Sequence, residues 1–251
     1  MAPELSVIIP AFNEAERLPA TLEIVAAYFA GRPETVEVII VDDGSSDGTG
    51  AVALPSGRGG QRIAWRRLAN AANRGKGYSV RHGMLAARGQ RLLFTDADLS
   101  APIAELARLE AALDAGADIA LGSRRNRKLL RQRQSWFREN AGRLFNRIVR
   151  LLLRLDFVDT QCGFKLFTRA SADAIFPLQR IDGWGFDPEL LFIARRLGLR
   201  AREVPVVWSH SAGAKIRLGR DSLRMFADVV RIRRNAWRGL YSAGRVRSVA
   251  A

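Results

Sequence analysis

The amino-acid sequence predicts an α/β fold with a mainly parallel central sheet flanked by helices. Across residues 1–123, short runs rich in β-branched residues alternate with amphipathic stretches, which is the pattern of strands joined by crossover helices. Runs such as Val38–Val41 are apolar at every position, which fits strands covered on both faces of a sheet. The chain has 251 residues, is 48% hydrophobic, and contains no low-complexity linker. We therefore expect a single domain over residues 1–251.

The predicted elements follow in order from the start of the chain. Apolar runs predict strands at residues 5–11, 36–43, 62–68, 91–98 and 118–124. Helical periodicity predicts helices at residues 18–30, 76–87 and 103–114, between those strands. After residue 124 the pattern changes, and basic amphipathic helices are expected at residues 143–155 and 221–237.

Composition restricts the class of protein. The chain has one cysteine, Cys162, so no disulfide can form within it, and its two histidines, His82 and His210, are far apart in the sequence. No apolar run approaches the ~20 residues that cross a bilayer, and the first residues lack the features of a signal peptide. We therefore expect a cytoplasmic protein.

The two parts of the chain differ in charge. Residues 1–123 contain 12 Lys and Arg against 15 Asp and Glu, whereas residues 124–251 contain 28 against 10. The basic second part indicates an anionic partner, which can be nucleic acid, anionic lipid or a phosphorylated substrate.

Polar residues follow the predicted strands where each one ends. These segments are Pro10–Glu14, Asp42–Thr49, Asp96–Asp98 and Gly122–Arg124, and Asn73–Gly77 opens the helix before the fourth strand. In open parallel sheets, ligands bind outside the carboxyl ends of the strands, so we expect these segments to form one crevice. The alternative is that the same residues only form turns and helix caps.

Asp96 and Asp98 indicate a cation. In an extended strand, residues i and i+2 point the same way, so both carboxylates can face one ion. Hard oxygen ligands favour Mg²⁺ or Mn²⁺, and such ions bind one or two protein carboxylates together with substrate phosphates. We therefore expect the ion to be shared with a diphosphate of the substrate.

Two further segments suit different parts of a nucleotide. The acidic turn at residues 42–49 suits the donors of a base or ribose, whereas the backbone amides of residues 73–77, with Arg74 and Lys76, suit phosphate. Neither segment matches the phosphate-binding loop of NTPases or the dinucleotide fingerprint. A hydride-transferring dehydrogenase is therefore disfavoured.

The helix predicted at residues 143–155 has a basic face. One stripe consists of Arg143, Arg147, Arg150 and Arg154, and the adjacent apolar stripe consists of Leu144, Ile148, Leu151 and Leu155. Such a helix suits a membrane interface, with arginines that extend to lipid phosphates. The alternative is that its leucines pack on the core while its arginines are solvated.

Several segments occur in the order and spacing seen in inverting family 2 glycosyltransferases. They are SVIIPAFNEAERLP, VIIVDDGSSDGT, NRGKGYSVRHGM, FTDADLSAP, GSR, DTQCGFKLF, WGFDPELLFIARRLG, EVPVVW and DSLRMFADVVRIR. The chain most resembles the dolichyl-phosphate glucosyltransferase branch and its bacterial polyprenyl-phosphate relatives. The resemblance implies a GT-A-type nucleotide-sugar-binding domain, in which residues 1–123 bind the donor and residues 124–251 form the acceptor side.

The resemblance also implies roles for individual residues. Pro10, Ala11, Asn13 and Glu14 would line the nucleotide pocket, with Asp43 near the base and Lys76 near the donor. Asp96 would contact the ribose or sugar, and Asp98 would bind Mg²⁺ or Mn²⁺. The related mannosyl-transferring branch usually has Gln two residues after the second aspartate, whereas this chain has Ser100. This difference weakens a mannosyl assignment and leaves the third metal ligand open.

The reaction implied by the resemblance moves a hexose, with glucose expected, from a nucleoside diphosphate sugar such as UDP-glucose to polyprenyl or dolichyl phosphate. A phosphate monoester is largely dianionic near neutral pH, so this acceptor needs positioning and charge neutralisation more than a base. We expect Arg124, Lys165 and Lys215 to hold its phosphate. We also expect peripheral association with an anionic membrane surface, with a membrane-protein partner as a further option.

Two other carboxylates allow a second mechanism. Asp187 and Glu189 could orient the sugar, or act as base if the acceptor were a sugar or protein hydroxyl. Asp187 could instead cap a helix that begins at Pro188. A nucleic-acid-binding protein would explain the basic second part but not the strand-end motifs, so we expect no nucleic-acid partner.

Overall fold

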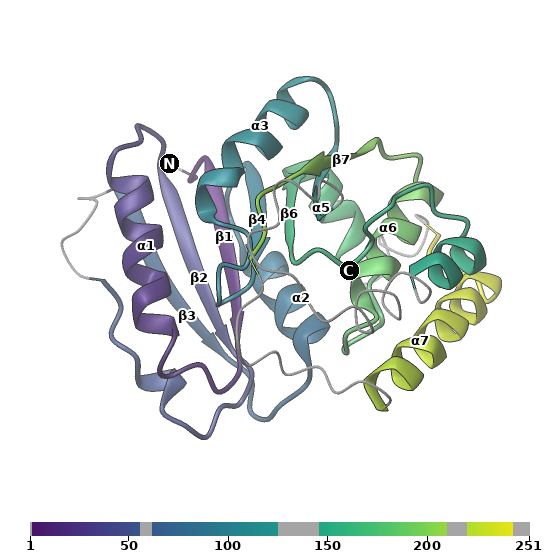
Figure 1. The fold of residues 1–251 in the computed structure, drawn as a ribbon, viewed down its shortest axis with the longest axis horizontal. Coiled ribbons are helices and arrows are strands. Elements are labelled where there is room, and N and C mark those ends of the chain that lie inside the picture. Colours follow the sequence, from purple (N-terminus) through teal and green to yellow (C-terminus); the bar gives the residue numbers. More distant parts are fainter. Residues whose placement is uncertain (1, 56–61, 125–145, 210–219, 243–251) are drawn as a thin grey trace, which may run out of the picture.

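The computed structural model of the chain describes residues 2–55, 62–124, 146–209 and 220–242 (Figure 1). One seven-stranded sheet runs through the molecule in the order β3-β2-β1-β4-β6-β5-β7. The strands are β1 (Leu5–Ala11), β2 (Val36–Asp42), β3 (Ile63–Ala69), β4 (Arg91–Thr95), β5 (Ile119–Ser123), β6 (Phe164–Thr168) and β7 (Ala201–Pro205). Within this sheet, β6 lies antiparallel between β4 and β5, and the other pairs are parallel. The mainly parallel sheet expected from the sequence is confirmed.

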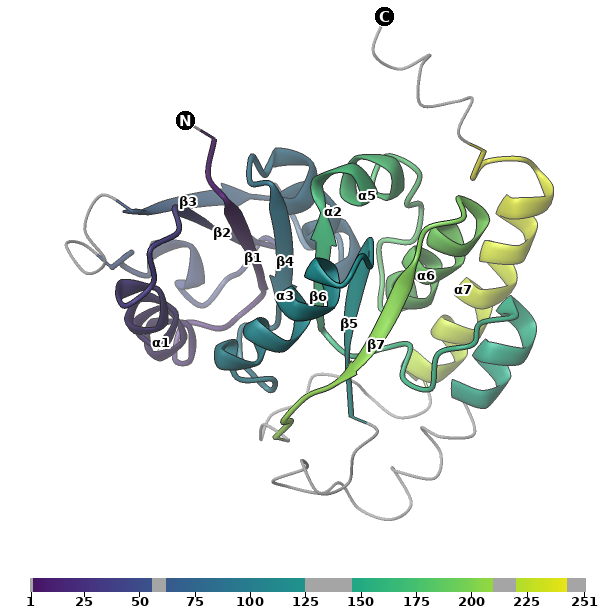
Figure 2. The same cartoon turned by 90° about the horizontal axis from the view of Figure 1, so that it is seen from above.

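Helices cover both faces of the sheet (Figures 1 and 2). They are α1 (Leu18–Ala30), α2 (Lys76–Ala86), α3 (Leu106–Asp114), α5 (Arg169–Ile175), α6 (Phe186–Arg196) and α7 (Arg220–Trp237). Short 3₁₀ helices lie at η1 (Thr49–Ala51) and η3 (Ile103–Glu105), and residues 146–153 are also helical.

Side chains of the central strands alternate between two cores. Val7 and Ile9 of β1 pack with α1 and α3, whereas Ile8 packs with α2, α5 and α6 on the other face. β2 follows the same rule, because Val38 and Ile40 belong to the first core while Ile39 and Val41 belong to the second. Both faces of these strands are therefore buried, which explains why the run Val38–Val41 is apolar without interruption.

The fourth predicted strand ends earlier than expected. The prediction was residues 91–98, but β4 stops at Thr95, and the next residues form a turn in which the Leu99 N–H donates to the Asp96 carbonyl at 3.1 Å. Apart from a possible helix that begins at Pro188, no strand or helix was predicted within residues 156–209, where β6, α5, α6 and β7 lie. The two strands, β6 and β7, have five residues each, and neither shows a periodicity that separates it from a buried helical segment.

The helix at residues 146–153 lacks the apolar face that was expected. Val149, Leu153 and Leu155 are buried, whereas Leu151 is 78% exposed. The grouping of Leu151 with Leu155 is wrong because the helix ends before Arg154, which has φ of +54°. Arg143 and Leu144 lie outside the described residues. In the part of the chain that the structure describes, no helix has both the length and the apolar character needed to cross a bilayer.

Candidate active site

Several strand ends meet at one edge of the sheet. β1 and β2 are parallel and in register, so Ala11 lies beside Asp42. β4 is the other parallel neighbour of β1, and Asp96 follows it directly. β6 runs the opposite way, so its first residue, Phe164, pairs with Thr95 at the same edge. These strand ends therefore lie together, and the strand order changes direction between β1 and β4, which is where a ligand crevice is expected in such a sheet.

The loops after β1 and β2 hold each other in place. The N–H of Asn13 donates to Ser45 Oγ, and Asn13 Oδ1 accepts from the N–H of Ser46, both at 2.9 Å. The N–H of Glu14 donates to Thr49 Oγ1 at 2.7 Å. Asn13 has φ of +50°, a region of backbone space that asparagine adopts more readily than most residues. Pro10 and Ala11, which were predicted to line the nucleotide pocket, end β1 and therefore lead into a fixed loop.

Asp43 organises the turn that precedes α2. Its buried carboxylate accepts hydrogen bonds from the N–H groups of Arg74 and Gly75, at 3.0 and 2.8 Å, and from Asn70 Nδ2 at 2.7 Å. Gly75 has φ of +99°, and a Cβ there would lie 2.6 Å from the carbonyl oxygen of Asp182. Asp43 is predicted to lie near the base, and in the structure its carboxylate fixes the turn at residues 73–77.

Lys76 begins α2 and forms an ion pair with Asp96. Its Nζ also lies 5.3 Å from the centroid of the Trp184 ring. Burial by itself would lower the pKa of Lys76, but the carboxylates of Asp96 and Asp187 outweigh it and raise that pKa. Lys76 is therefore a cation at neutral pH, which suits an anionic ligand in the crevice.

Asp96 and Asp98 have different surroundings. The Asp96 carboxylate lies against Gly163, where any Cβ would collide with its oxygens. Asp98 instead accepts hydrogen bonds from the N–H and the hydroxyl of Ser100, both at 2.9 Å. Because β4 ends at Thr95, both aspartates lie beyond the strand, and strand alternation does not turn their carboxylates towards one cation as predicted.

The surroundings of Asp98 nevertheless suit a divalent ion. The described residues contain no group of three or more His, Cys, Asp or Glu side chains that could hold a metal. Mg²⁺ in nucleotide sites needs only one or two carboxylates, because substrate phosphates and waters complete its coordination. Asp98 is half-buried, and each of its oxygens accepts one bond from Ser100, so lone pairs remain on both. Asp98 therefore fits an ion shared with a diphosphate, and Ser100 orients its carboxylate.

Lys165 and Asp187 form a buried ion pair. Lys165 is fully buried in β6, and its Nζ also donates to the Cys162 carbonyl at 2.6 Å. Asp187 lies in the first turn of α6, whose N-cap is Gly185, so the alternative that Asp187 caps a helix is wrong. Burial raises the pKa of Asp187, although Lys165 and Lys76 oppose that shift. Since Lys165 faces the interior, the structure does not support its predicted contact with an acceptor phosphate.

Arg124 follows β5 and is held on two sides. Its Nε and Nη2 donate to the two carboxylate oxygens of Asp159, at 2.6 and 2.7 Å. Its guanidinium also lies 5.4 Å from the centroid of the Trp208 ring. Burial alone would raise the pKa of Asp159, but Arg124 lowers that pKa to about 2. With 33% of its side chain exposed, Arg124 is fixed in place and still open to a ligand.

Glu189 is a structural residue. It is fully buried, and its carboxylate accepts from the N–H groups of Arg180 and Ile181, at 3.0 and 2.8 Å, and from the Tyr241 hydroxyl at 2.5 Å. Burial raises the pKa of Glu189 to about 7 despite these donors. Because the carboxylate is enclosed, the structure does not support the alternative that Glu189 is a base or a sugar contact.

Some residues around the site were missed. Gly163 and Asp159 stand in one recognised motif and Trp208 in another, but only the fold shows their contacts with Asp96 and Arg124. Tyr241 carried no signal, because its partner Glu189 is far away in the sequence. Lys215, which was predicted to join Arg124 at the acceptor phosphate, lies outside the described residues.

Comparison with known proteins identifies the family. Residues 6–176 match the family model described as glycosyl transferase family 2. The chain is 41% identical to the dolichyl-phosphate beta-glucosyltransferase of Drosophila melanogaster, over 94% of this chain and 77% of that protein. It is 35% identical to the protein of the same name from Homo sapiens, over 94% of this chain and 78% of that protein.

Solved structures share the fold. Mannosyl-3-phosphoglycerate synthase from Rubrobacter xylanophilus has a TM-score of 0.67 at 20% identity, covering 95% of this chain and 76% of its own. Glucosyl-3-phosphoglycerate synthase from Mycobacterium tuberculosis, crystallised with Mn²⁺, UDP and glucosyl-3-phosphoglycerate, has a TM-score of 0.61 at 20% identity, covering 92% and 80%. The expected GT-A-type fold is thereby confirmed. The chain is a glycosyltransferase, and it belongs to glycosyl transferase family 2.

Proposed function

We propose that this enzyme transfers glucose from UDP-glucose to dolichyl or polyprenyl phosphate, with inversion at the anomeric carbon. The observation that carries the proposal is the likeness, at 41% identity, to a protein named dolichyl-phosphate beta-glucosyltransferase. This likeness covers 94% of the chain, so it includes the basic second part as well as the donor side. A shared nucleotide-binding fold alone would not indicate which acceptor the enzyme uses.

The crevice between β1 and β4 is the proposed donor site. Asn13 and Glu14 lie in a loop whose backbone is already fixed by the turn after β2, so Pro10, Ala11 and this loop present a preformed wall to the nucleotide. Asp43 fixes the turn that precedes Lys76, because its carboxylate accepts a hydrogen bond from the Gly75 N–H. We assign Lys76 to the donor phosphates and Asp96 to a ribose or sugar hydroxyl, because a cation and an acceptor suit those groups.

Asp98 is the proposed ligand of Mg²⁺ or Mn²⁺. When bound, the ion would neutralise charge on the departing nucleoside diphosphate. Ser100 contributes by keeping the Asp98 carboxylate oriented through two hydrogen bonds. The M. tuberculosis enzyme of the same fold was crystallised with Mn²⁺ and UDP, which supports this assignment.

Arg124 is the proposed contact for the acceptor phosphate, together with Lys215. Asp159 and Trp208 hold the Arg124 guanidinium, so little conformational freedom is lost when it binds a phosphate. The acceptor phosphate is largely dianionic near neutral pH, so it can attack without a protein base. The surroundings of the two carboxylates considered as bases support a mechanism without a protein base. Asp187 is paired with Lys165, and Glu189 is enclosed. Asp187 is then a positioning residue near Lys76 and Asp96.

A transfer assay tests the proposal. The purified chain is incubated with Mg²⁺, a short-chain polyprenyl phosphate, and UDP-glucose, GDP-mannose or UDP-N-acetylglucosamine, and the product is analysed by mass spectrometry and NMR. We expect a β-linked glucosyl phosphate lipid from UDP-glucose alone, and no product after chelation of the metal. The matching polyprenol, which has a hydroxyl in place of the phosphate, serves as control acceptor. Equal transfer to that alcohol, or a preference for GDP-mannose, would contradict the proposal.

A further inference from the structure

Helix α7 has two apolar stripes, and within the part of the chain that the structure describes only one of them is buried against the protein. Met225, Val229 and Ile232 are buried, at spacings of four and three residues. A second stripe, which we call the outer stripe, consists of Leu223, Phe226, Val230 and Trp237, which are 73%, 44%, 51% and 95% exposed. Its spacings of three, four and seven residues place these side chains on one face of the helix, away from the buried face.

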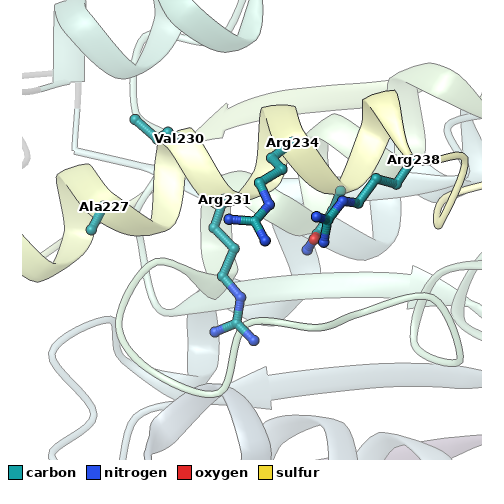
Figure 3. A pocket seen from close by; sticks show the side chains of 6 residues that line it. Ala227, Val230, Arg231, Arg234 and Arg238 are labelled. Carbon is teal, nitrogen blue, oxygen red and sulfur yellow. The ribbon is translucent and has the colours of Figure 1, made fainter.

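Arginines flank the outer stripe on both sides. Arg231, Arg234 and Arg238 line a hollow of about 380 Å³ together with Ala227, Val230 and Asn235 (Figure 3). Arg233 is exposed, and its position in the helical repeat places it along the other margin of the stripe. Between Leu223 and Trp237 the sequence has one acid, Asp228, whose side chain lies against Gly185. The margins of the outer stripe are therefore cationic.

A neighbouring helix extends this surface. Figures 1 and 2 both show the helix of residues 146–153 beside α7. Among the described residues, six of the eight exposed large apolar side chains lie on these two helices, Leu151 and Leu152 included. A second hollow, of about 270 Å³, is lined by Arg154, Phe192, Arg195, Arg196 and Arg233. Exposed apolar side chains and arginines thus gather at one end of the molecule.

We propose that the outer stripe of α7 is the surface by which the enzyme docks on an anionic lipid bilayer. A helix of this kind lies in the plane of the interface, with its apolar face among the acyl chains and its arginines extended to lipid phosphates. Trp237, at the end of the helix, suits the level of the headgroups. The inference rests on the proposed function insofar as the acceptor is a membrane lipid.

Charge distinguishes a bilayer from a second copy of this chain. A twofold-symmetric dimer through the outer stripe would bring the flanking arginines of both copies together, and like charges at such an interface repel. An anionic bilayer instead attracts every one of these arginines. The same charge pattern that opposes self-association therefore favours lipid.

Docking through α7 places the catalytic crevice close to the membrane. Asp228 of α7 packs against Gly185, and the adjacent Trp184 lies over Lys76 in the donor site. The docking helix and the proposed donor site therefore contact the same short segment, residues 184–185.

Vesicle flotation without substrates tests the docking surface. The probes are phosphatidylcholine vesicles with and without phosphatidylglycerol. One variant replaces three of the four side chains of the outer stripe (F226S/V230S/W237S), and another reverses two flanking charges (R234E/R238E). A matched apolar control, I24S/L85S, alters two side chains that are about half exposed on α1 and α2. A matched charge control, R108E, alters an exposed arginine on α3.

We expect wild-type protein to float with the anionic vesicles only. The affinity should fall roughly a hundredfold when the three apolar side chains are replaced and by at least about thirtyfold when the two charges are reversed, with both controls unchanged. Circular dichroism melting shows whether each variant is folded. If the apolar variant does not fold, the charge variant still tests the docking surface.

Three results would overturn the inference: no binding of wild-type protein to anionic vesicles, α7 variants that bind as the controls do, or a wild-type dimer that the apolar variant makes monomeric. Transfer to a detergent-dispersed short-chain acceptor is measured in parallel. Vesicle binding without any transfer refutes the proposed function alone, whereas transfer without dependence of vesicle binding on α7 refutes the docking surface alone.

Discussion

The proposed donor edge, formed by the loops after β1, β2 and β4, and the proposed acceptor side, around Arg124 and β6, are built in different ways. At the donor edge, side chains bind backbone amides of neighbouring loops, as Asn13 does with Ser46 and Asp43 with Gly75. On the acceptor side, a buried ion pair joins Lys165 to Asp187, whereas the charged pair at the donor edge, Lys76 with Asp96, is partly exposed. The first arrangement shapes a pocket from turns. The second arrangement buries charges, and each buried charge needs a partner of opposite sign. Changes on the acceptor side should therefore alter the unfolding free energy more than changes at the donor edge.

Breaking the Lys165–Asp187 pair should give the largest effect on folding. Lys165→Met leaves a buried carboxylate without its partner, which typically costs about 3–5 kcal/mol of unfolding free energy. The double variant Lys165→Met/Asp187→Leu should recover most of this loss, because it removes both charges. Urea denaturation measures both variants. A single variant as stable as wild type would contradict the contrast between the two sides.

Asp98→Asn should show the opposite behaviour at the donor edge. We expect kcat/KM for glucosyl transfer to fall by about 10³-fold, because the proposed metal ligand is lost. The unfolding free energy should change little, since Asp98 is half-buried and its two hydrogen bonds are local. Ser100→Ala, which removes one of those bonds, is the matched control, with an expected loss of about tenfold. Asp98→Asn activity close to wild type would exclude the metal assignment.

The pH dependence of stability should report on Glu189. Its pKa of about 7 in the folded state exceeds the ordinary 4.5, so between these values the native state holds a proton that the unfolded state releases. Stability should therefore fall as pH rises through this window, by up to about 3 kcal/mol. Glu189→Gln should lose the slope, as measured by urea denaturation at several pH values.

Asp159 provides an internal contrast for that experiment. Its pKa is lowered to about 2, so its contribution is complete above the ordinary value of 3.8 and is lost only as pH falls below it. Asp159→Asn should therefore leave the slope between pH 4.5 and 7 unchanged. A slope that persists in Glu189→Gln would show that another group is responsible.

Gly163→Ala should give a smaller loss of activity. It tests a contact between the two sides, because Gly163 directly precedes β6 and lies against Asp96. The added methyl would collide with the Asp96 carboxylate, so Asp96 must move relative to Lys76. We expect about a hundredfold loss of kcat/KM, since small displacements of positioning groups have effects of this size. Gly31→Ala is the matched control, because a Cβ at Gly31 meets no atom within 4 Å. Equal activities of the two variants would contradict the placement of Asp96.

The sequence predicted the donor edge better than the acceptor side, for a physical reason. Parallel strands deliver their carboxyl ends to one edge, so strand positions alone place Asn13, Asp43 and Asp96 near one another. Lys165 lies on an antiparallel strand, and its burial depends on α6, which is built from a distant part of the chain. Neither periodicity nor charge could show that this lysine faces Asp187.

Two errors have local causes. The run at residues 91–98 looks like one strand, but the turn closed by Leu99 ends β4 at Thr95, so the carboxylates do not alternate as strand residues do. Asp187 precedes a proline as a helix cap often does, yet α6 already begins at Phe186. In both cases the local backbone geometry sets where the strand ends or the helix begins, and residue types alone do not specify that geometry.

The most direct test of the account is the position of the metal relative to the donor. Crystals grown with UDP-glucose and Mn²⁺, measured at the manganese absorption edge, would locate the ion by its anomalous signal. We expect one peak in the crevice between β1 and β4, bound by the Asp98 carboxylate and the diphosphate, with Lys76 on the donor phosphates. A donor bound elsewhere, or a manganese ion that does not contact Asp98, would contradict the account.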